Sequence, residues 1–380
     1  VTLVVTKNTI SPSGAKSSPI NIEYISYDYD EGFSPKTAEE YMAHIERKVS
    51  ESLPALIDKH QSGGNPVKVL VNDSLMPWVV DLGHGLGLKV AQFFTQACAV
   101  CAIYYHVHQG RIEVPLEEGC TISLPCIPEL EIHELPADLF DGLYPGTTAL
   151  LTNQFLNIHK ADWIFFNTFD ALETEIAKWL SSQWPIKTIG PSIPSMYIDK
   201  RLPNDKDYGL SLFQPDAQSC IKWLDTKPNG SVIYISFGSL ANLGQDHMDE
   251  LANGLLNSNS NFLWVVRESE RSKLPNNFIS KAAGKGLVVG WCPQLEVLAH
   301  KAVGSFMTHC GWNSMLEALS LGVPMLAMPQ LTDQTTNAKY VVDVWRTGVR
   351  VKGRDKGIVI REEITGFVND VMEGGKGERT

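Results

Sequence analysis

Short apolar runs rich in β-branched residues alternate with longer amphipathic stretches along most of the chain. In the first half, the strand-like runs cover Val1 to Thr6, Val67 to Asn72, Leu88 to Thr95 and Trp163 to Thr168. Between the first two runs, the stretch from Thr37 to Gln61 repeats apolar residues with a period near 3.6, which predicts a helix. Continuous apolar strands joined by helices are typical of a parallel sheet.

The same alternation returns in the second half of the chain. The strands predicted there are Val232 to Phe237, Phe262 to Arg267, Leu287 to Gly290, Ser305 to Thr308, Met325 to Met328 and Val349 to Val351. Between the halves, residues 196–215 are rich in charge, proline and asparagine and are interpreted as a linker. The pattern therefore predicts an α/β protein with two doubly wound domains, residues 1–195 and 216–380, that face each other across a cleft.

Composition and charge exclude several classes of function. The 380 residues are too many for one compact core, which agrees with two domains. The formal net charge of −11 disfavours a nucleic-acid or anionic-membrane partner. No run of about 18 apolar residues appears, and the first residues lack the basic flank of a signal peptide. We therefore expect a cytoplasmic protein that acts as a monomer on small molecules.

The seven cysteines are odd in number and widely scattered, which predicts free thiols rather than disulfides. Two interpretations are open for Cys98 and Cys101, which precede His106 and His108. The four residues have the chemistry of a metal or redox site, but the residues around the two cysteines are apolar. A buried helix in which the thiols pack as small apolar groups is the favoured interpretation.

The turn after the fourth predicted strand of the second half suits a phosphate group. Gly311 allows close approach of the backbone, and Asn313 and Ser314 can cap a helix start, where the amide groups and the helix dipole favour an anion. Glu317, one turn into that helix, can accept hydrogen bonds from two ribose hydroxyls. A capping box formed by Ser314 and Glu317 is the structural alternative.

Five further residues near this turn suit a nucleotide sugar. His309 can donate a hydrogen bond at the same place. Trp291 offers a flat face for a base, and Gln294 lies one helical turn later. Asp333 and Gln334 follow the next strand and suit bidentate hydrogen bonding with vicinal sugar hydroxyls. The sequence therefore predicts a base platform, an anion site, a ribose acceptor and a sugar-binding amide in the order that a nucleotide sugar needs.

Residues 291–334, which read WCPQLEVLAHKAVGSFMTHCGWNSMLEALSLGVPMLAMPQLTDQ, resemble the 44-residue signature box of plant family-1 UDP-dependent glycosyltransferases. Similar motifs extend over nearly the whole chain: Asn72-Asp73-Ser74-Leu75-Met76-Pro77-Trp78, Asn167-Thr168-Phe169-Asp170-Ala171-Leu172-Glu173, Ile189-Gly190-Pro191 and Ser236-Phe237-Gly238-Ser239. The resemblance implies a GT-B fold of two Rossmann-like domains and an inverting, metal-independent enzyme without a cofactor. It is nearest to the subgroup that glucosylates small acids, phenolics and terpenoids.

The resemblance also implies which residues bind the co-substrate UDP-glucose. The predicted donor-binding residues are Thr95, Ser239, Trp291, Cys292, Gln294, His309, Gly311, Trp312, Asn313, Ser314, Glu317, Asp333 and Gln334. Among them, Trp291 is expected to stack on uracil and Glu317 to bind the ribose. Gln334 resembles the residue of UDP-glucose users, whereas galactose users have a histidine there.

An apolar acceptor is the second expected partner. Leu75, Met76, Phe93, Tyr104 and Tyr105 are candidates for the wall of its site, and each is equally compatible with a place in the hydrophobic core. Transfer to a hydroxyl or carboxyl of this acceptor would give a β-glucoside.

The general base of the family is a histidine in a Gly-His-x-x-Pro loop after the first strand. This sequence begins at what looks like the second strand, so we expect about 40 residues before Val1, and further helices after the end of the sequence. Asp73 matches the carboxylate that orients this histidine, although a strand-end turn is the structural alternative.

The sequence is compatible with one other function and disfavours a second. A non-catalytic nucleotide-sugar-binding protein is the alternative if the histidine is missing. A nicotinamide dehydrogenase is disfavoured, since Gly83, Gly85 and Gly87 do not have the Gly-x-Gly-x-x-Gly spacing. Within the box, Leu331 replaces a usual Trp and Met315 a usual Thr, and the loss of the indole predicts a wider sugar pocket or a changed acceptor range.

Overall fold

The computed structural model describes residues 1–6, 20–25, 35–117, 119–140, 145–208, 216–351 and 358–374. These residues form two compact units. The first unit contains the described residues up to Ser192, and the second contains Ile193–Asp207 and the described residues from 216 onward. Residues 209–215 of the predicted linker lie outside the described residues, and the limits expected for the domains stay a prediction.

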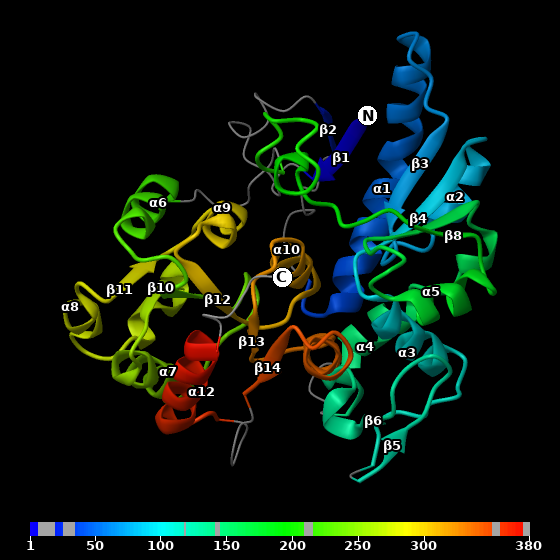
Figure 1. Ribbon diagram of the computed structural model, residues 1–380. Helices are drawn as coiled ribbons and strands as arrows, with labels where there is room; N and C mark the ends of the chain where they lie inside the picture. The colour runs from blue at the N-terminus through cyan, green and yellow to red at the C-terminus, as the bar shows by residue number, and fades with distance from the viewer. Residues whose placement is uncertain are drawn as a thin grey trace. The chain divides into compact units, whose positions relative to one another are not determined.

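In the described part of the second unit, six parallel strands form one sheet (Figure 1). They are β9 (Val232–Ser236), β10 (Asn261–Val265), β11 (Gly286–Val289), β12 (Val303–Thr308), β13 (Met325–Ala327) and β14 (Gly348–Arg350). Their order is β11-β10-β9-β12-β13-β14, so the chain runs outward from β9 and then returns to start again at β12 on its other side. This is the Rossmann order, in which ligands bind beyond the carboxyl ends of the strands at the reversal.

Helices cover both faces of this sheet. They are α6 (Ala217–Asp225), α7 (Gln245–Asn257), α8 (Phe278–Ala282), α9 (Gln294–Ala299), α10 (Trp312–Ser320), α11 (Gln334–Lys339) and α12 (Arg361–Gly374). Asp216 caps α6, since its side chain accepts a hydrogen bond from the Ser219 amide at 3.2 Å. Asp216 is therefore the N-cap of α6.

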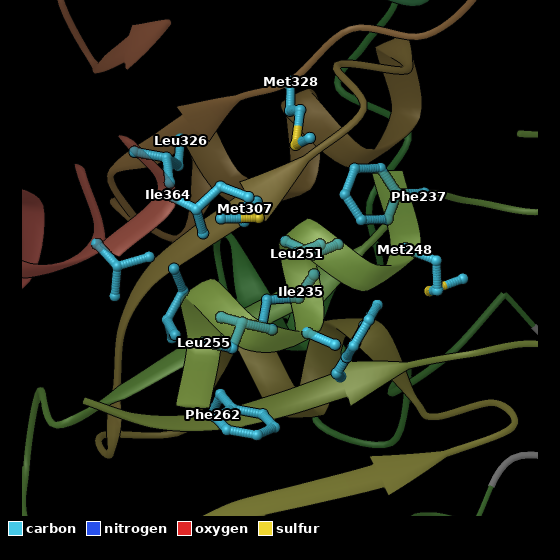
Figure 2. Close-up of a cluster of buried hydrophobic side chains, with 14 of the residues drawn as sticks. Ile235, Phe237, Met248, Leu251, Leu255, Phe262, Met307, Leu326, Met328 and Ile364 are labelled. Atoms are coloured by element: carbon cyan, nitrogen blue, oxygen red, sulfur yellow. The ribbon is translucent and has the colours of Figure 1, made fainter. Parts of the chain in front are cut away.

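The hydrophobic core of the second unit fixes the strands that lead to the site. Figure 2 shows Leu251 and Leu255 of α7 with Phe262 of β10 and Met307 of β12. All five residues of β9 are buried, as expected for a strand with a partner on each side and helices on both faces. Neighbouring strands and packed side chains therefore fix the position of the carboxyl end of β9.

The first unit has a smaller parallel sheet in the order β3-β4-β7-β8 among the described residues. Its strands are β3 (Val69–Asp73), β4 (Lys89–Phe94), β7 (Trp163–Phe166) and β8 (Ile186–Thr188). A separate parallel pair joins β1 (Thr2–Thr6) to β2 (Asn21–Ile25), and an antiparallel pair joins β5 (Thr121–Ile122) to β6 (Leu130–Glu131). The side chains of Val69 and Val71 are 46% and 53% exposed, so β3 is an open edge in this part of the chain.

Helices α1 (Ala38–Ser62), α2 (Val79–Gly85), α3 (Cys98–His108), α4 (Pro145–Asn153) and α5 (Thr174–Ser181) belong to the first unit. Short 3₁₀ helices of the chain are Ile132–Glu134, Ala137–Leu139, Ile158–Lys160, Ser195–Tyr197 and Glu268–Lys273, and Tyr340–Val344 is a π-helix. The prediction of a helix from Thr37 is confirmed, because Thr37 caps α1 by accepting from the Glu40 amide at 3.1 Å. Among the described residues, no helix is both long enough and apolar enough to cross a membrane.

The seven cysteines are all free thiols, as predicted. Cys98 and Cys101 are fully buried on α3, which confirms the interpretation of this stretch as a buried apolar helix. Cys126 is exposed and Cys120 is half-buried, and both lie next to the β5–β6 pair.

Candidate active site

The predicted donor-binding residues of the second unit follow the carboxyl ends of four parallel strands. Ser239 follows β9, Trp291 follows β11, His309 follows β12 and Asp333 follows β13. Because β9 and β12 are neighbours at the reversal of the strand order, Ser239 and His309 lie at the point where such sheets bind ligands.

His309 lies against two glycines. A Cβ atom added at Gly238 would lie 2.7 Å from Nε2 of His309, and one added at Gly311 would overlap the same atom. Gly238 also has a φ of +71°, a conformation that glycine adopts at little cost. Only glycine at these two positions leaves room for the imidazole ring.

The His309 ring is uncharged at neutral pH. Its burial lowers the pKa from 6.5 to about 4, although a backbone hydrogen bond with Ser236 acts in the opposite direction. A neutral imidazole has no positive charge and a single N–H donor, and here the backbone of Ser236 takes that donor, so His309 can donate to a phosphate oxygen only if its N–H leaves Ser236.

The helix after β12 begins at Trp312, at least two residues earlier than a cap at Asn313 or Ser314 would place it. Gly311 is the N-cap of α10 and has an extended backbone, with φ −64° and ψ 138°. Asn313 and Ser314 are therefore the second and third helical residues, and the prediction that they cap the helix is wrong. The alternative of a capping box between Ser314 and Glu317 is also wrong, because neither residue stands at the N-cap position.

A chain of hydrogen bonds orients Glu317, the residue predicted to bind the ribose. Nε2 of Gln294 donates to Oε2 of Glu317 at 2.8 Å and to Oγ of Ser314 at 3.0 Å. The Tyr234 hydroxyl donates to Oε1 of Gln294 at 3.0 Å and lies 3.3 Å from the Cys292 sulfur. Glu317 is only 5% exposed, so its carboxylate is held in one orientation by Gln294.

The side-chain oxygen of Gln334 forms hydrogen bonds within its own turn. Oε1 of Gln334 accepts hydrogen bonds from the backbone amides of Gln330 and Leu331, each at 2.9 Å. A hydrogen bond from the Gln334 amide to the Leu331 carbonyl, at 3.1 Å, closes the same turn. The side-chain NH₂ group of Gln334 is therefore the part of this residue that suits a hydrogen bond to a sugar hydroxyl.

Asp333 is linked to the turn after β12. Nδ2 of Asn337 donates to Oδ2 of Asp333 at 2.8 Å and to the Cys310 carbonyl at 3.0 Å. Two residues without the freedom of glycine have a positive φ here, Cys310 at 66° and Thr332 at 44°. Such conformations cost free energy, so the surrounding structure has to hold both turns in place.

Two aromatic residues complete the second unit's candidates. Trp291 is half-buried, and its carbonyl accepts from the Asp216 amide at 3.1 Å, which ties it to the start of α6. Trp312 is 4% exposed and lies 6.1 Å from the Trp345 ring, centroid to centroid. Met315, which replaces a Thr that is usual in the family's signature box, is fully buried in the core.

In the first unit, the candidates gather at the carboxyl ends of β3 and β4. Asp73 is the register partner of Phe93, and Thr95 follows β4 with its side chain exposed. Oδ1 of Asp73 accepts a hydrogen bond from the Leu75 amide at 2.9 Å. Burial raises the pKa of Asp73, and the Leu75 bond acts against that rise. The carboxylate thus forms a strand-end turn and keeps Oδ2 for another partner.

The apolar candidates of the first unit fall into two groups. Leu75, Met76 and Phe93 are half-buried at the strand ends. Tyr104 is fully buried, and its hydroxyl donates to Oδ1 of Asp138 at 2.7 Å. Of the two places left open for Tyr104, the acceptor site and the hydrophobic core, the structure therefore shows the core.

Sequence reasoning did not assign three residues that organise these turns. Tyr234 supports Gln294, Asn337 joins two turns, and Glu173 accepts from the amides of Cys98 and Ala99 at the start of α3, each at 3.1 Å. A polar side chain inside an apolar strand or helix, such as Tyr234, was the available signal, because buried polar groups need a partner.

The fold and these turns define the class of protein as an α/β enzyme with a Rossmann-type nucleotide site. A profile described as "UDP-glucoronosyl and UDP-glucosyl transferase" matches residues 189–359. UDP-glucosyltransferase 74AE2 of Panax ginseng is 54% identical over 381 residues, which cover 100% of this chain and 84% of that protein. The chain belongs to the plant family-1 UDP-glycosyltransferases.

Solved structures agree with this assignment. Os79 from O. sativa in complex with UDP is 36% identical, with a TM-score of 0.89 over 98% of this chain and 84% of that one. The same protein in complex with UDP and deoxynivalenol-3-glucoside is 35% identical, with a TM-score of 0.86 over 100% of this chain and 85% of that one. The predicted GT-B fold is confirmed, and the chain is an enzyme of glycosyl transfer from a UDP-sugar to a small acceptor.

Proposed function

We propose that this chain transfers glucose from UDP-glucose to a hydroxyl or carboxyl of a small apolar acceptor, with inversion to a β-glucoside. The observation that carries the proposal is the convergence of Ser239, His309 and the start of α10 at the reversal between β9 and β12. The 54% identity to a plant UDP-glucosyltransferase supports a diphosphate at this point of the sheet. The earlier expectation of a monomeric, cytoplasmic enzyme remains part of the proposal.

The donor would lie along the turns of the second unit in the proposed arrangement. Trp291 stacks on uracil, with Cys292 beside it, and Glu317 with Gln294 binds the ribose. His309, Gly311, Asn313, Ser314 and Ser239 bind the diphosphate. Trp312, Asp333 and Gln334 bind the glucose, and Thr95 of the first unit contacts the sugar or diphosphate. The engagement of Oε1 of Gln334 supports a role as a donor to one sugar hydroxyl.

The chemical step needs a proton acceptor and a stabilised leaving group. As the acceptor oxygen attacks the anomeric carbon, it loses its proton to a general-base histidine of the kind that the family resemblance implies, and Asp73 orients that histidine. The departing UDP gains negative charge, which the dipole and amides of the α10 start stabilise. We propose that this replaces a metal ion, so chelators should leave the rate unchanged.

The acceptor class rests on apolar strand-end residues. Leu75, Met76 and Phe93 present apolar side chains beside Asp73, where a small terpenoid or phenolic hydroxyl would be placed for deprotonation. The complex of Os79 contains a glucoside of deoxynivalenol, and that related protein supports an acceptor of this size.

The test is a donor and acceptor panel on the full-length protein. Mass spectrometry should detect hexosides of apolar acceptors with UDP-glucose, at a lower yield with UDP-galactose, and the anomeric proton coupling in NMR should identify the β-glucoside. An α-glucoside would contradict inversion. UDP binding without any product would favour the non-catalytic nucleotide-sugar-binding alternative.

A further inference from the structure

The loop between β9 and α7 carries Ser239 on a short exposed stretch between two residues of the hydrophobic core, Phe237 and Ala241. Its residues 237–244 are neither helix nor strand. Ser239 is exposed, and the side chain of Leu240 is 83% exposed. The core residues hold the two ends of this stretch, whereas the exposed side chains of Ser239 and Leu240 contribute no burial that would orient their own peptide groups.

Two basic side chains from the connection after β10 bind the carbonyl groups of this loop. The guanidinium of Arg267 donates from one nitrogen to the Ser239 carbonyl and from a second nitrogen to the Ala241 carbonyl. Nζ of Lys273 donates to the Leu243 carbonyl at 2.9 Å. A planar guanidinium can span two carbonyls in a fixed geometry, which a single ammonium group does not reproduce.

Orientation of these carbonyls also orients the following amides. In a trans peptide, the C=O and the next N–H point in opposite directions. The Ser239 and Ala241 carbonyls face Arg267, so the N–H groups of Leu240 and Asn242 face away from it. Backbone N–H groups that share one orientation favour an anion, and the Ser239 hydroxyl lies on the same stretch.

We propose that Arg267 is a positioning residue for donor binding, which orients the Ser239 loop toward the diphosphate without touching the phosphate itself. This inference rests on the proposed function of the second unit as the UDP-glucose site. Lys273 supports the far end of the loop, and Oε2 of Glu270 at 2.8 Å balances its charge. The two acceptor carbonyls occupy both terminal nitrogens of the Arg267 guanidinium.

The test compares the binding of uridine and UDP by calorimetry. Arg267→Met should weaken UDP binding about 10-fold, the size expected for one charge-assisted hydrogen bond, and leave uridine binding within about twofold. Arg267→Lys keeps the charge and should recover only part of the UDP affinity. Arg271→Met is the matched control, since Arg271 has the same charge in the same connection and pairs with Glu268 at 3.3 Å on the surface. It should bind UDP as the wild type does.

A second measurement asks whether Arg267 acts through the loop. Combined with Ser239→Ala, Arg267→Met should weaken UDP binding by less than the sum of the two single changes. Full additivity, equal losses for uridine and UDP, or wild-type UDP affinity in Arg267→Lys would each overturn the inference. Thermal unfolding verifies that each variant is folded. If Arg267→Met does not fold, the UDP affinity of Arg267→Lys tests the inference instead. A wild-type protein that binds no UDP would instead contradict the proposed function.

Discussion

The helix that follows a strand is used differently in the two units. In the first unit, β4 leads through Thr95 to α3, and the carboxylate of Glu173 binds the amides of Cys98 and Ala99 at the helix start. In the second unit, β12 leads to α10, whose N-cap is Gly311 and carries no side chain.

The difference shows how one geometry serves either stability or ligand binding. A helix start favours a negative group. At α3 the chain supplies that group itself, from a fully buried Glu173. At α10 no side chain at the N-cap competes with an external anion, and the adjacent imidazole is neutral. We therefore expect α3 to be a structural helix start and α10 to be the diphosphate site, and four predictions test this contrast.

The largest effect is expected on turnover. Asp73→Asn in the full-length protein should lower kcat about 10²–10⁴-fold, the range for the loss of acid–base assistance. UDP affinity should be unchanged, because the diphosphate site is proposed in the second unit. Asn keeps an oxygen for the Leu75 amide, so the turn should survive. Steady-state kinetics and calorimetry measure the two quantities, and near wild-type glucosylation of a simple alcohol would leave Asp73 as a turn residue only.

The next effect is a pH dependence of stability from His309. Its folded-state pKa of about 4 lies below the ordinary 6.5, so the unfolded state takes up the proton first as pH falls. The stability that neutral His309 provides is present above pH 6.5 and is lost as pH falls toward 4, by at most about 3 kcal/mol. Urea unfolding of the wild type and His309→Gln across this range should show a shallower loss in the variant. Identical slopes would mean that His309 is not buried as described.

Glu317 should account for part of the nucleoside affinity. Glu317→Ala should weaken UDP binding by about 1.5–3 kcal/mol, the range for hydrogen bonds to a charged group. Uridine should lose as much as UDP, because the contact is to the ribose. Glu317→Gln keeps the side-chain shape and an oxygen for Gln294, and calorimetry should place it between the wild type and Glu317→Ala. Unchanged affinity in a folded Glu317→Ala variant would remove the assignment.

The smallest effect is expected at the start of α3, where the carboxylate of Glu173 binds the helix amides. Glu173→Gln should destabilise the fold by about 1–2 kcal/mol, because an NH₂ group would face one of the two amides of α3. UDP affinity should stay within twofold of the wild type. A loss of UDP affinity in the folded variant would break the contrast, since it would mean that the α3 start also takes part in donor binding.

Most strands of both sheets could be predicted because they read as continuous apolar runs. The exceptions have physical reasons. β8 has three residues with Lys187 at its centre, and β2 mixes Asn21 and Glu23 with apolar residues, so neither gives such a run. The start of α10 was misplaced because the prediction looked for a capping side chain, whereas Gly311 caps through its backbone alone.

The site could be predicted where its residues are neighbours in sequence. Trp291, His309 and Glu317 were identified from one continuous box, on a resemblance rather than on geometry. Tyr234 lies 60 positions from Gln294, and Arg267 lies 28 from Ser239. Contacts across such separations depend on the fold, and a single sequence does not reveal them.

The distribution of the thiols has a practical consequence for spectroscopy. Five of the seven cysteines are buried, and the exposed Cys126 and half-buried Cys120 flank the small β5–β6 pair of the first unit. A maleimide dye would therefore react first at Cys126, without any engineered cysteine. Such a fluorophore would report on the first unit alone, and a change of its emission on adding an acceptor, but not on adding uridine, would separate the two binding events in a single cuvette.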